Sequence, residues 1–294
     1  MSNFVILTDS SCDLSHEMAE QLGLHVVPLT VSSPKGDFKN YLDHREVDVE
    51  TFYGYLRAGD MCKTSAINTE QWTEAMEEII KSGKDVLCLA FSSGLSGTYS
   101  ASAIAAQDLS EKYPERKVYS VDTLCASLGQ GLLVDLTVQE QRKGKTIEEV
   151  RDFCEGIKGK IHHWVTVGNL TQLKRGGRLT AAKAFFGSLL HVKPIIHVDS
   201  KGRLVAVDTI KGRKKAINHL VEQMGEMIVA PEGQRCYIVN SDCTPEAEAL
   251  AEVLKEKFPI SEVVIGDIGP VIGSHTGKDT IAVFFQGQER TSED

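Results

Sequence analysis

The chain has 294 residues, of which 41% are hydrophobic and 25% are charged, and its formal net charge at pH 7 is −9. These values are ordinary for a folded protein with a buried core. The negative charge argues against nucleic acid as a main partner, because phosphate contacts need a basic surface. No apolar run is long enough to span a bilayer, and residues 1–4 lack the features of a signal peptide. We therefore expect a cytoplasmic protein.

The cysteines predict reduced, mostly buried thiols. There are seven, at Cys12, Cys62, Cys88, Cys125, Cys154, Cys236 and Cys243. Because the number is odd and no Cys-x-x-Cys pair occurs, neither disulfides nor a zinc site is indicated. The pair His162-His163 also lacks metal-ligand spacing, so we expect no metal cofactor.

The first half of the chain alternates strands with helices. We expect strands over residues 4–7, 25–31, 86–91 and 118–121, and helices over residues 14–22, 49–57, 69–80 and 98–112. Asp48 is a suitable N-cap for one helix, and Asn68 or Thr69 for the next. This alternation predicts a parallel sheet with helices on both faces. Ligands of such folds bind beyond the carboxyl ends of the strands.

The second half has a different pattern. Two successive helices, over residues 124–142 and 147–158, make a boundary, and Thr146-Ile-Glu-Glu149 matches a capping box. Further on we expect strands over residues 163–167, 235–239, 262–265 and 280–285, a hairpin of 194–198 with 204–209, and helices over 170–174, 181–190, 213–227 and 245–257. Thr244 followed by Pro245 predicts the N-cap and first residue of the last helix.

Together these patterns predict an α/β protein of two domains. Residues 1–158 would form an N-terminal α/β domain around a parallel sheet. Residues 159–294 would form a C-terminal α+β domain around a mixed sheet, because a hairpin interrupts the alternating pattern. We expect the ligand to lie between the two domains.

Turns rich in glycine and hydroxyl groups follow several of these strands. The strongest are residues 92–98, Ser-Ser-Gly-Leu-Ser-Gly-Thr, and residues 269–277, Gly-Pro-Val-Ile-Gly-Ser-His-Thr-Gly, and the pair Thr64-Ser65 precedes a helix. Glycine lets backbone N–H groups converge, and hydroxyls add uncharged donors, so such a lining suits a carboxylate or phosphate. The alternative interpretation of residues 92–98 is an ordinary helix N-terminus that needs caps.

Two segments resemble enzyme motifs, but neither matches its motif completely. Gly94-Leu95-Ser96-Gly97 lacks one residue of the G-x-S-x-G nucleophile elbow, and no histidine or acid can be assigned to activate Ser96. Residues 273–278 are one residue short of a phosphate-binding loop, and Asp279 replaces the Ser or Thr that would hold magnesium. The sequence therefore favours binding over catalysis. A serine-dependent hydrolase acting on a lipid-like ester and a regulatory interaction protein remain alternatives.

Residues 174–178, Lys-Arg-Gly-Gly-Arg, form a compact basic turn in an acidic protein. One interpretation is a helix C-terminus with favourable dipole contacts and a glycine stop, in which Arg178 anchors the turn through carbonyl groups. The other is a docking point, centred on Arg175, for an acidic partner or a phosphate. The sequence leaves both open.

These motifs, taken in order, resemble the DegV family of bacterial fatty-acid-binding proteins. The resemblance covers the whole chain and is carried by residues 8–13 (TDSSCD), 63–65 (KTS), 91–99 (FSSGLSGTY), 121–123 (VDT), 173–179 (LKRGGRL), 193–196 (KPII) and 269–277 (GPVIGSHTG). One departure is Lys278-Asp279, where family members commonly have Pro-Gly.

The resemblance implies two α/β domains with a long-chain fatty acid between them. Its carboxylate would meet Thr64, Ser65, Ser93, His275 and Thr276, with Gly94 donating a backbone N–H. Its tail would lie in an apolar tunnel of the second domain. The apolar stretch 184–190 is more typical of plain core, but the same side chains could also line such a tunnel. No cofactor beyond the bound fatty acid is implied. Relatives of this kind deliver the fatty acid to a separate kinase that makes an acyl-phosphate for phospholipid synthesis.

Overall fold

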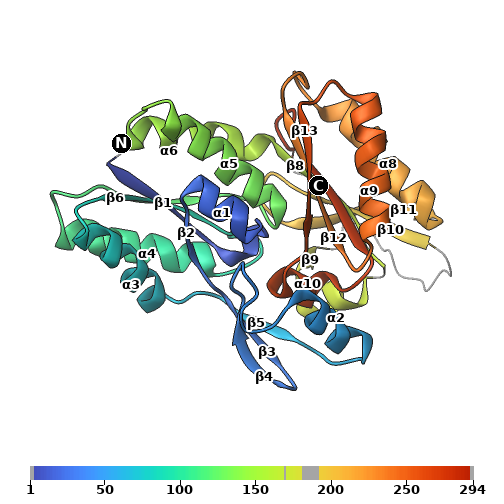
Figure 1. Cartoon of the computed structure of the whole chain (residues 1–294), viewed down its shortest axis with the longest axis horizontal. Helices are drawn as coiled ribbons and strands as arrows, with labels where there is room; N and C mark the ends of the chain where they lie inside the picture. Colours follow the sequence, from blue (N-terminus) through green and yellow to red (C-terminus); the bar gives the residue numbers. More distant parts are fainter. Residues whose placement is uncertain (1–2, 169, 181–191, 292–294) are drawn as a thin grey trace.

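The N-terminal half is built on a parallel sheet, as the alternating pattern predicts. A computed structural model describes residues 3–168, 170–180 and 192–291 (Figure 1). The strands β1 (Phe4–Asp9), β2 (His25–Val27), β6 (Asp85–Ala90) and β7 (Val118–Asp122) lie in the order β2-β1-β6-β7, and every neighbouring pair is parallel. All four therefore end at the same edge.

Helices alternate with the strands along this half of the chain. They are η1 (Ser10–Cys12), α1 (His16–Leu22), α2 (Val49–Arg57), α3 (Thr69–Lys81), α4 (Thr98–Lys112), α5 (Leu128–Arg142), α6 (Ile147–Ile157) and η2 (Lys158–Lys160). The predicted caps are confirmed: Asp48 accepts from the N–H of Thr51, and Asn68 and Thr146 each form a capping box.

A small antiparallel sheet was not predicted. It consists of β3 (Thr30–Ser33), β4 (Gly36–Lys39) and β5 (Lys63–Ser65), in the order β4-β3-β5. The single strand predicted over residues 25–31 is divided between β2 and β3 at Pro28, which has no N–H to continue a ladder. β5 therefore places Thr64 on a strand.

The C-terminal half contains the predicted mixed sheet. Its strands are β8 (Ile161–Thr166), β9 (Leu179–Thr180), β10 (Val192–Val198), β11 (Leu204–Lys211), β12 (Arg235–Ser241), β13 (Glu262–Asp267) and β14 (Thr280–Gln286), in the order β13-β12-β14-β8-β10-β11-β9. Its helices are α7 (Thr171–Gly176), α8 (Arg213–Met227), α9 (Thr244–Lys257) and α10 (Pro270–Thr276). The predicted hairpin is the antiparallel pair β10 and β11.

Several local predictions need correction. Residues 269–277 were expected to be a loop, but Pro270 starts the short helix α10, since proline fits the first turn. α5 starts only at Leu128, because Leu124 and Ser127 have φ values of 51° and 54°. The expected Thr244 N-cap is wrong: Cys243 holds that position. The helix expected over 181–190 lies outside the described residues.

Helix α5 joins the two halves. It contacts β8, β12 and β14 of the mixed sheet and packs against α6 and η1 of the N-terminal half. One buried cluster runs through it, from Phe4 and Leu89 on one side to Tyr237 and Phe284 on the other. In Figure 1 the two sheets lie on either side of α5.

All seven cysteines are free thiols, and six of them are buried, as predicted.

Candidate functional site

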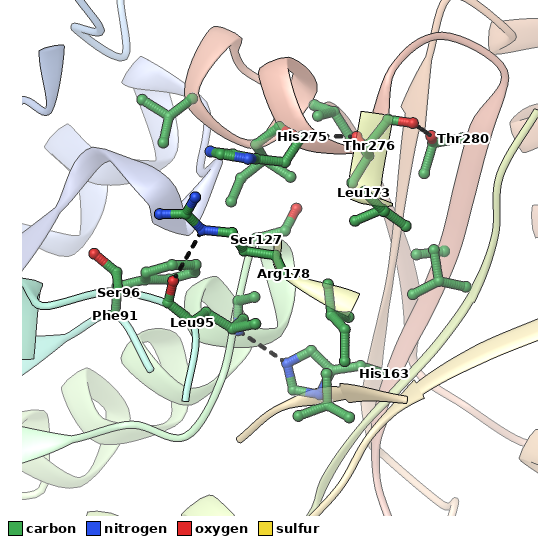
Figure 2. Close-up of a pocket in the computed structure, with 18 of the residues that line it drawn as sticks. Phe91, Leu95, Ser96, Ser127, His163, Leu173, Arg178, His275, Thr276 and Thr280 are labelled. Atoms are coloured by element: carbon green, nitrogen blue, oxygen red, sulfur yellow. Dashed lines mark hydrogen bonds between the residues drawn. The ribbon is translucent and has the colours of Figure 1, made fainter. Parts of the chain in front are cut away.

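A cavity of about 140 Å³ is lined by residues of both halves (Figure 2). The N-terminal half contributes β5, the loop after β6 and the residues before α5, and the C-terminal half contributes β8, β10, β12, β14, α7 and α10. Much of the lining is apolar and includes Phe91, Leu95, Val165, Ile196, Val239 and Phe284. The cavity can therefore hold an apolar group.

One part of the lining is polar. The Thr64 hydroxyl lies 2.8 Å from Nε2 of His275, and Thr276 follows on α10. Nδ1 of His275 is buried and has no hydrogen-bond partner among the described residues. This ring is confined by Gly176, where an added Cβ would lie 2.6 Å from Nδ1. β5, α7 and α10 thus position one imidazole at the cavity.

The His275 ring is neutral at pH 7. Burial, and secondly the positive charge of Arg178, lowers its pKa to about 4. A neutral imidazole carries one N–H donor and one acceptor nitrogen. An anion bound beside it would favour the protonated form, so a carboxylate ligand is expected to raise this pKa.

Arg178 is a lining residue that the predicted site did not contain. Its Nε donates to the carbonyl of Leu95 at 3.3 Å and its Nη1 donates to the carbonyl of Gly176 at 2.5 Å. These bonds confirm that Arg178 anchors the basic turn through carbonyl groups. The bond to Leu95 also connects the two halves, and Figure 2 shows the guanidinium beside the His275 ring. The polar part of the cavity therefore includes a fixed positive charge.

The loop after β6 is covered by the turn between β10 and β11. Ser92 donates its hydroxyl to the carbonyl of Gly202 at 2.8 Å, and the N–H of Gly94 donates to the Ser92 hydroxyl at 3.2 Å. The N–H of Ser93 donates to Asp122 at 3.1 Å, and the Ser93 residue is exposed. In this loop Ser96 and Gly97 line the cavity, together with Leu95.

The structure brings together Thr64, His275 and Thr276 from the predicted set. Ser65 and Ser93 are exposed and, like Gly94, are not among the residues that line the cavity. Arg175 is exposed too, with its guanidinium 3.9 Å from the sulfur of Met61. Which of these groups contact a ligand stays a prediction.

His163 is a second lining residue that sequence reasoning set aside. Its Nε2 accepts from the N–H of Ala126 at 3.1 Å, so the proton is on Nδ1, which lies 3.0 Å from the carbonyl of Ile161. Burial holds its pKa well below the usual range. Every residue of β8 is buried, so the sequence of this strand does not indicate which face meets the cavity.

The motif at residues 8–11 holds the loop after β6 in place. The buried carboxyl of Asp9 accepts from the N–H groups of Ser11 and Phe91, at 3.1 and 2.8 Å, and from the Gln130 side chain at 3.2 Å. Burial raises the pKa of Asp9, and these bonds oppose that shift. Asp9 thereby fixes the end of β6, where the Ser92–Gly97 loop begins.

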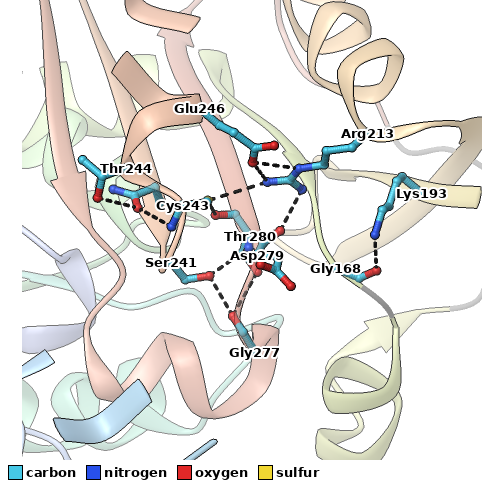
Figure 3. A network of polar contacts seen from close by, with 11 residues as sticks. Gly168, Lys193, Arg213, Ser241, Cys243, Thr244, Glu246, Gly277, Asp279 and Thr280 are labelled. Atoms are coloured by element: carbon cyan, nitrogen blue, oxygen red, sulfur yellow. Dashed lines mark hydrogen bonds and ion pairs between the residues drawn. The ribbon is translucent and has the colours of Figure 1, made fainter. Parts of the chain in front are cut away.

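The segment Lys278-Asp279, which departs from the family pattern, is held by a polar network (Figure 3). Ser241 donates its hydroxyl to the carbonyl of Gly277 at 2.8 Å and accepts from the N–H of Thr280 at 2.8 Å. Arg213 donates to the carbonyl of Asp279 at 2.7 Å. The end of α10 is thus tied to the mixed sheet.

The described residues contain neither a cluster suited to a metal ion nor a helix suited to a membrane. No group of three or more His, Cys, Asp or Glu is placed to hold a metal ion. No helix there is long and apolar enough to cross a membrane.

Comparison with known proteins gives consistent matches. The model of the family described as "Uncharacterised protein, DegV family" matches residues 3–288. A DegV domain-containing protein of Clostridium perfringens is 43% identical over 290 residues, 99% of both chains.

Solved structures agree over similar lengths. A DegV family protein from Thermus thermophilus, described as binding fatty acid, is 30% identical, with a TM-score of 0.88 over 97% of this chain and 100% of that one. DegV from Bacillus subtilis, described as a fatty acid binding protein, is 29% identical, with a TM-score of 0.84 over 98% and 100%. Since the family model and a close relative both cover nearly the whole chain, the protein belongs to the DegV family.

Proposed function

We propose that this protein is a carrier that binds a long-chain fatty acid and catalyses no reaction of its own. The observation that carries the proposal is the cavity between the two sheets, which combines an apolar lining with the polar group of Thr64, His275 and Arg178. A fatty acid has the same two parts. The described fatty-acid binding of structural neighbours supports this assignment.

In this proposal the tail supplies most of the affinity. Burying an acyl chain stabilises a complex by about 0.8 kcal/mol per CH₂ group. The head group supplies orientation, because hydrogen bonds to a carboxylate are directional and charge-assisted. Thr64, His275 and Thr276 are the central head-group contacts, and Ser65, Ser93 and Gly94 remain predicted contacts from the family motifs. The apolar stretch 184–190, interpreted from the sequence as core or tunnel lining, lies outside the described residues.

Removing head-group contacts is expected to weaken binding. Thr64→Val and His275→Ala should each cost about 1–3 kcal/mol of binding free energy, the range for a hydrogen bond to a charged group. Displacement of a fluorescent fatty acid by palmitate measures this loss, with Ser93→Ala assayed in parallel. If both Thr64→Val and His275→Ala bind palmitate as tightly as wild type, the carboxylate binds elsewhere.

The proposal includes delivery of the fatty acid to a kinase, with Arg175 as the docking residue. Arg175→Ala is expected to leave palmitate affinity unchanged while slowing kinase-dependent phosphorylation of the bound acid, most clearly at low salt. Charge complementarity chiefly accelerates encounter, and salt screens it. Phosphorylation rates equal to wild type at both low and high salt would contradict the docking role.

The serine hydrolase alternative has less support. The Ser96 hydroxyl lies 2.9 Å from that of Thr98, and within the described residues no His or acid is hydrogen-bonded to it. Turnover of lipid-like esters that is lost in Ser93→Ala or Ser96→Ala would favour this alternative. A co-purifying protein partner without bound lipid would favour a regulatory interaction protein.

A further inference from the structure

Asp13 lies at the junction of the two halves and is buried, with 6% of its surface exposed. It follows η1 in the left-handed conformation, with φ of 51°. Burial raises its pKa to about 7, opposed by hydrogen bonds from Ser127 and Gly269. Burying a carboxyl is unfavourable unless it is hydrogen-bonded. The partners of Asp13 therefore indicate what this residue does.

The two hydrogen bonds reach a cavity-lining residue of the N-terminal half and the N-cap residue of helix α10. Oδ2 accepts from the hydroxyl of Ser127 at 2.5 Å, and Oδ1 accepts from the N–H of Gly269 at 3.1 Å. Ser127 lines the cavity in front of α5. Gly269 is the N-cap of α10, the helix that carries His275 and Thr276. One carboxyl therefore joins the N-terminal half to the helix that carries the imidazole.

The backbone at Gly269 and Ser127 packs tightly against Asp13. An added Cβ on Gly269 would lie 2.9 Å from Oδ1 of Asp13. Ser127 has φ of 54° and ψ of −145°, a conformation that favours glycine, yet its hydroxyl is present and bonded to Asp13. Nearby, the Tyr53 hydroxyl donates to the carbonyl of Ile268 at 2.9 Å and holds the same approach to α10.

We propose that Asp13 is a positioning residue for the head-group end of the cavity. By holding Gly269 and Ser127 at once, it sets the place of α10 relative to the N-terminal half, which carries Thr64, and so the pairing of His275 with Thr64. The inference rests on the proposed function, in which that pair binds the carboxylate.

The test uses two substitutions of Asp13 that both tolerate its left-handed backbone. Asp13→Gly removes the carboxyl, whereas Asp13→Asn keeps an acceptor for Gly269 and a donor for the Ser127 oxygen. We expect Asp13→Gly to weaken palmitate binding at least tenfold and to shift the ¹⁵N resonances of the His275 ring in ligand-free protein. Asp13→Asn should retain both properties, with affinity within threefold of wild type.

Controls separate positioning from loss of stability. Leu220→Ala removes a fully buried side chain of α8 and should lower the unfolding free energy without moving the His275 resonances. If Asp13→Gly does not fold, Gly269→Ala displaces the carboxyl from the other side and should shift the same resonances.

Unchanged His275 resonances in Asp13→Gly or Gly269→Ala, equal shifts in Asp13→Asn, or equal shifts in Leu220→Ala would overturn the inference. A wild-type protein that binds no palmitate would refute the proposed function instead. The ligand-free resonances would then still decide whether Asp13 positions His275.

Discussion

Gly94→Ala is expected to separate the Ser92–Gly97 loop from the turn between β10 and β11. An added Cβ at Gly94 would lie 2.6 Å from the carbonyl oxygen of Lys201 and 2.7 Å from that of Gly202. Both are backbone atoms, so the clash is relieved only if the loop and the turn move apart. We expect the unfolding free energy to fall by about 1–3 kcal/mol, the usual cost of overpacking.

The same movement should open the cavity, because Leu95, Ser96 and Gly97 line it. Palmitate affinity is therefore expected to fall together with stability, measured by fluorescence displacement and urea unfolding. Gly156→Ala is the matched control, since this residue of α6 does not line the cavity and nothing lies within 4 Å of its added Cβ. A Gly94→Ala protein with wild-type stability and affinity would show that this contact is not needed.

Gly176→Ala is expected to lower affinity without lowering stability. The added Cβ would lie 2.6 Å from Nδ1 of His275 and displace the ring from Thr64. Gly176 ends α7 with an ordinary φ, and alanine is favoured over glycine in helices by roughly 0.5–1 kcal/mol. Palmitate binding should fall about tenfold or more, while the urea midpoint stays the same or rises.

Gly156→Ala in α6 provides the comparison, because its added Cβ meets nothing within 4 Å. It should show the same helix effect on stability and no change in affinity. If Gly176→Ala binds palmitate as tightly as wild type, the exact placement of His275 does not matter for binding.

The sequence predicts a structural feature correctly where the residues that determine it are neighbours in the chain. Asp48, Asn68 and Thr146 cap helices as expected, because a cap needs only a side chain and an N–H two or three residues later. The alternation of elements likewise predicted the parallel sheet, since short connections limit the possible arrangements.

What failed depended on contacts between distant segments. The short strand β5 exists because Thr64 pairs with Val31 across a separate small sheet. Arg178 reaches the carbonyl of Leu95, 83 residues earlier in the chain. His163 faces the cavity because β8 lies in the middle of the mixed sheet. None of these placements has a periodic or capping signal.

Part of the site was nevertheless predictable from motifs. Thr64 and His275 are 211 residues apart in the chain, and the family resemblance predicts that they share a site; their side chains lie 2.8 Å apart. Their contact with a fatty-acid head group stays a prediction. Two of the motif glycines are required by close packing, which the sequence does not indicate. Gly94 and Gly176 leave room for close contacts, where sequence reasoning expected backbone donors or a helix stop.

Native mass spectrometry of the protein purified from a bacterial host tests the carrier proposal most directly. Gentle ionisation should show a complex with one fatty acid of about 14–18 carbons per chain, released intact by solvent extraction. His275→Ala and Gly176→Ala should carry less of it than Gly156→Ala. Protein that contains no lipid and gains none when incubated with palmitate would contradict the account.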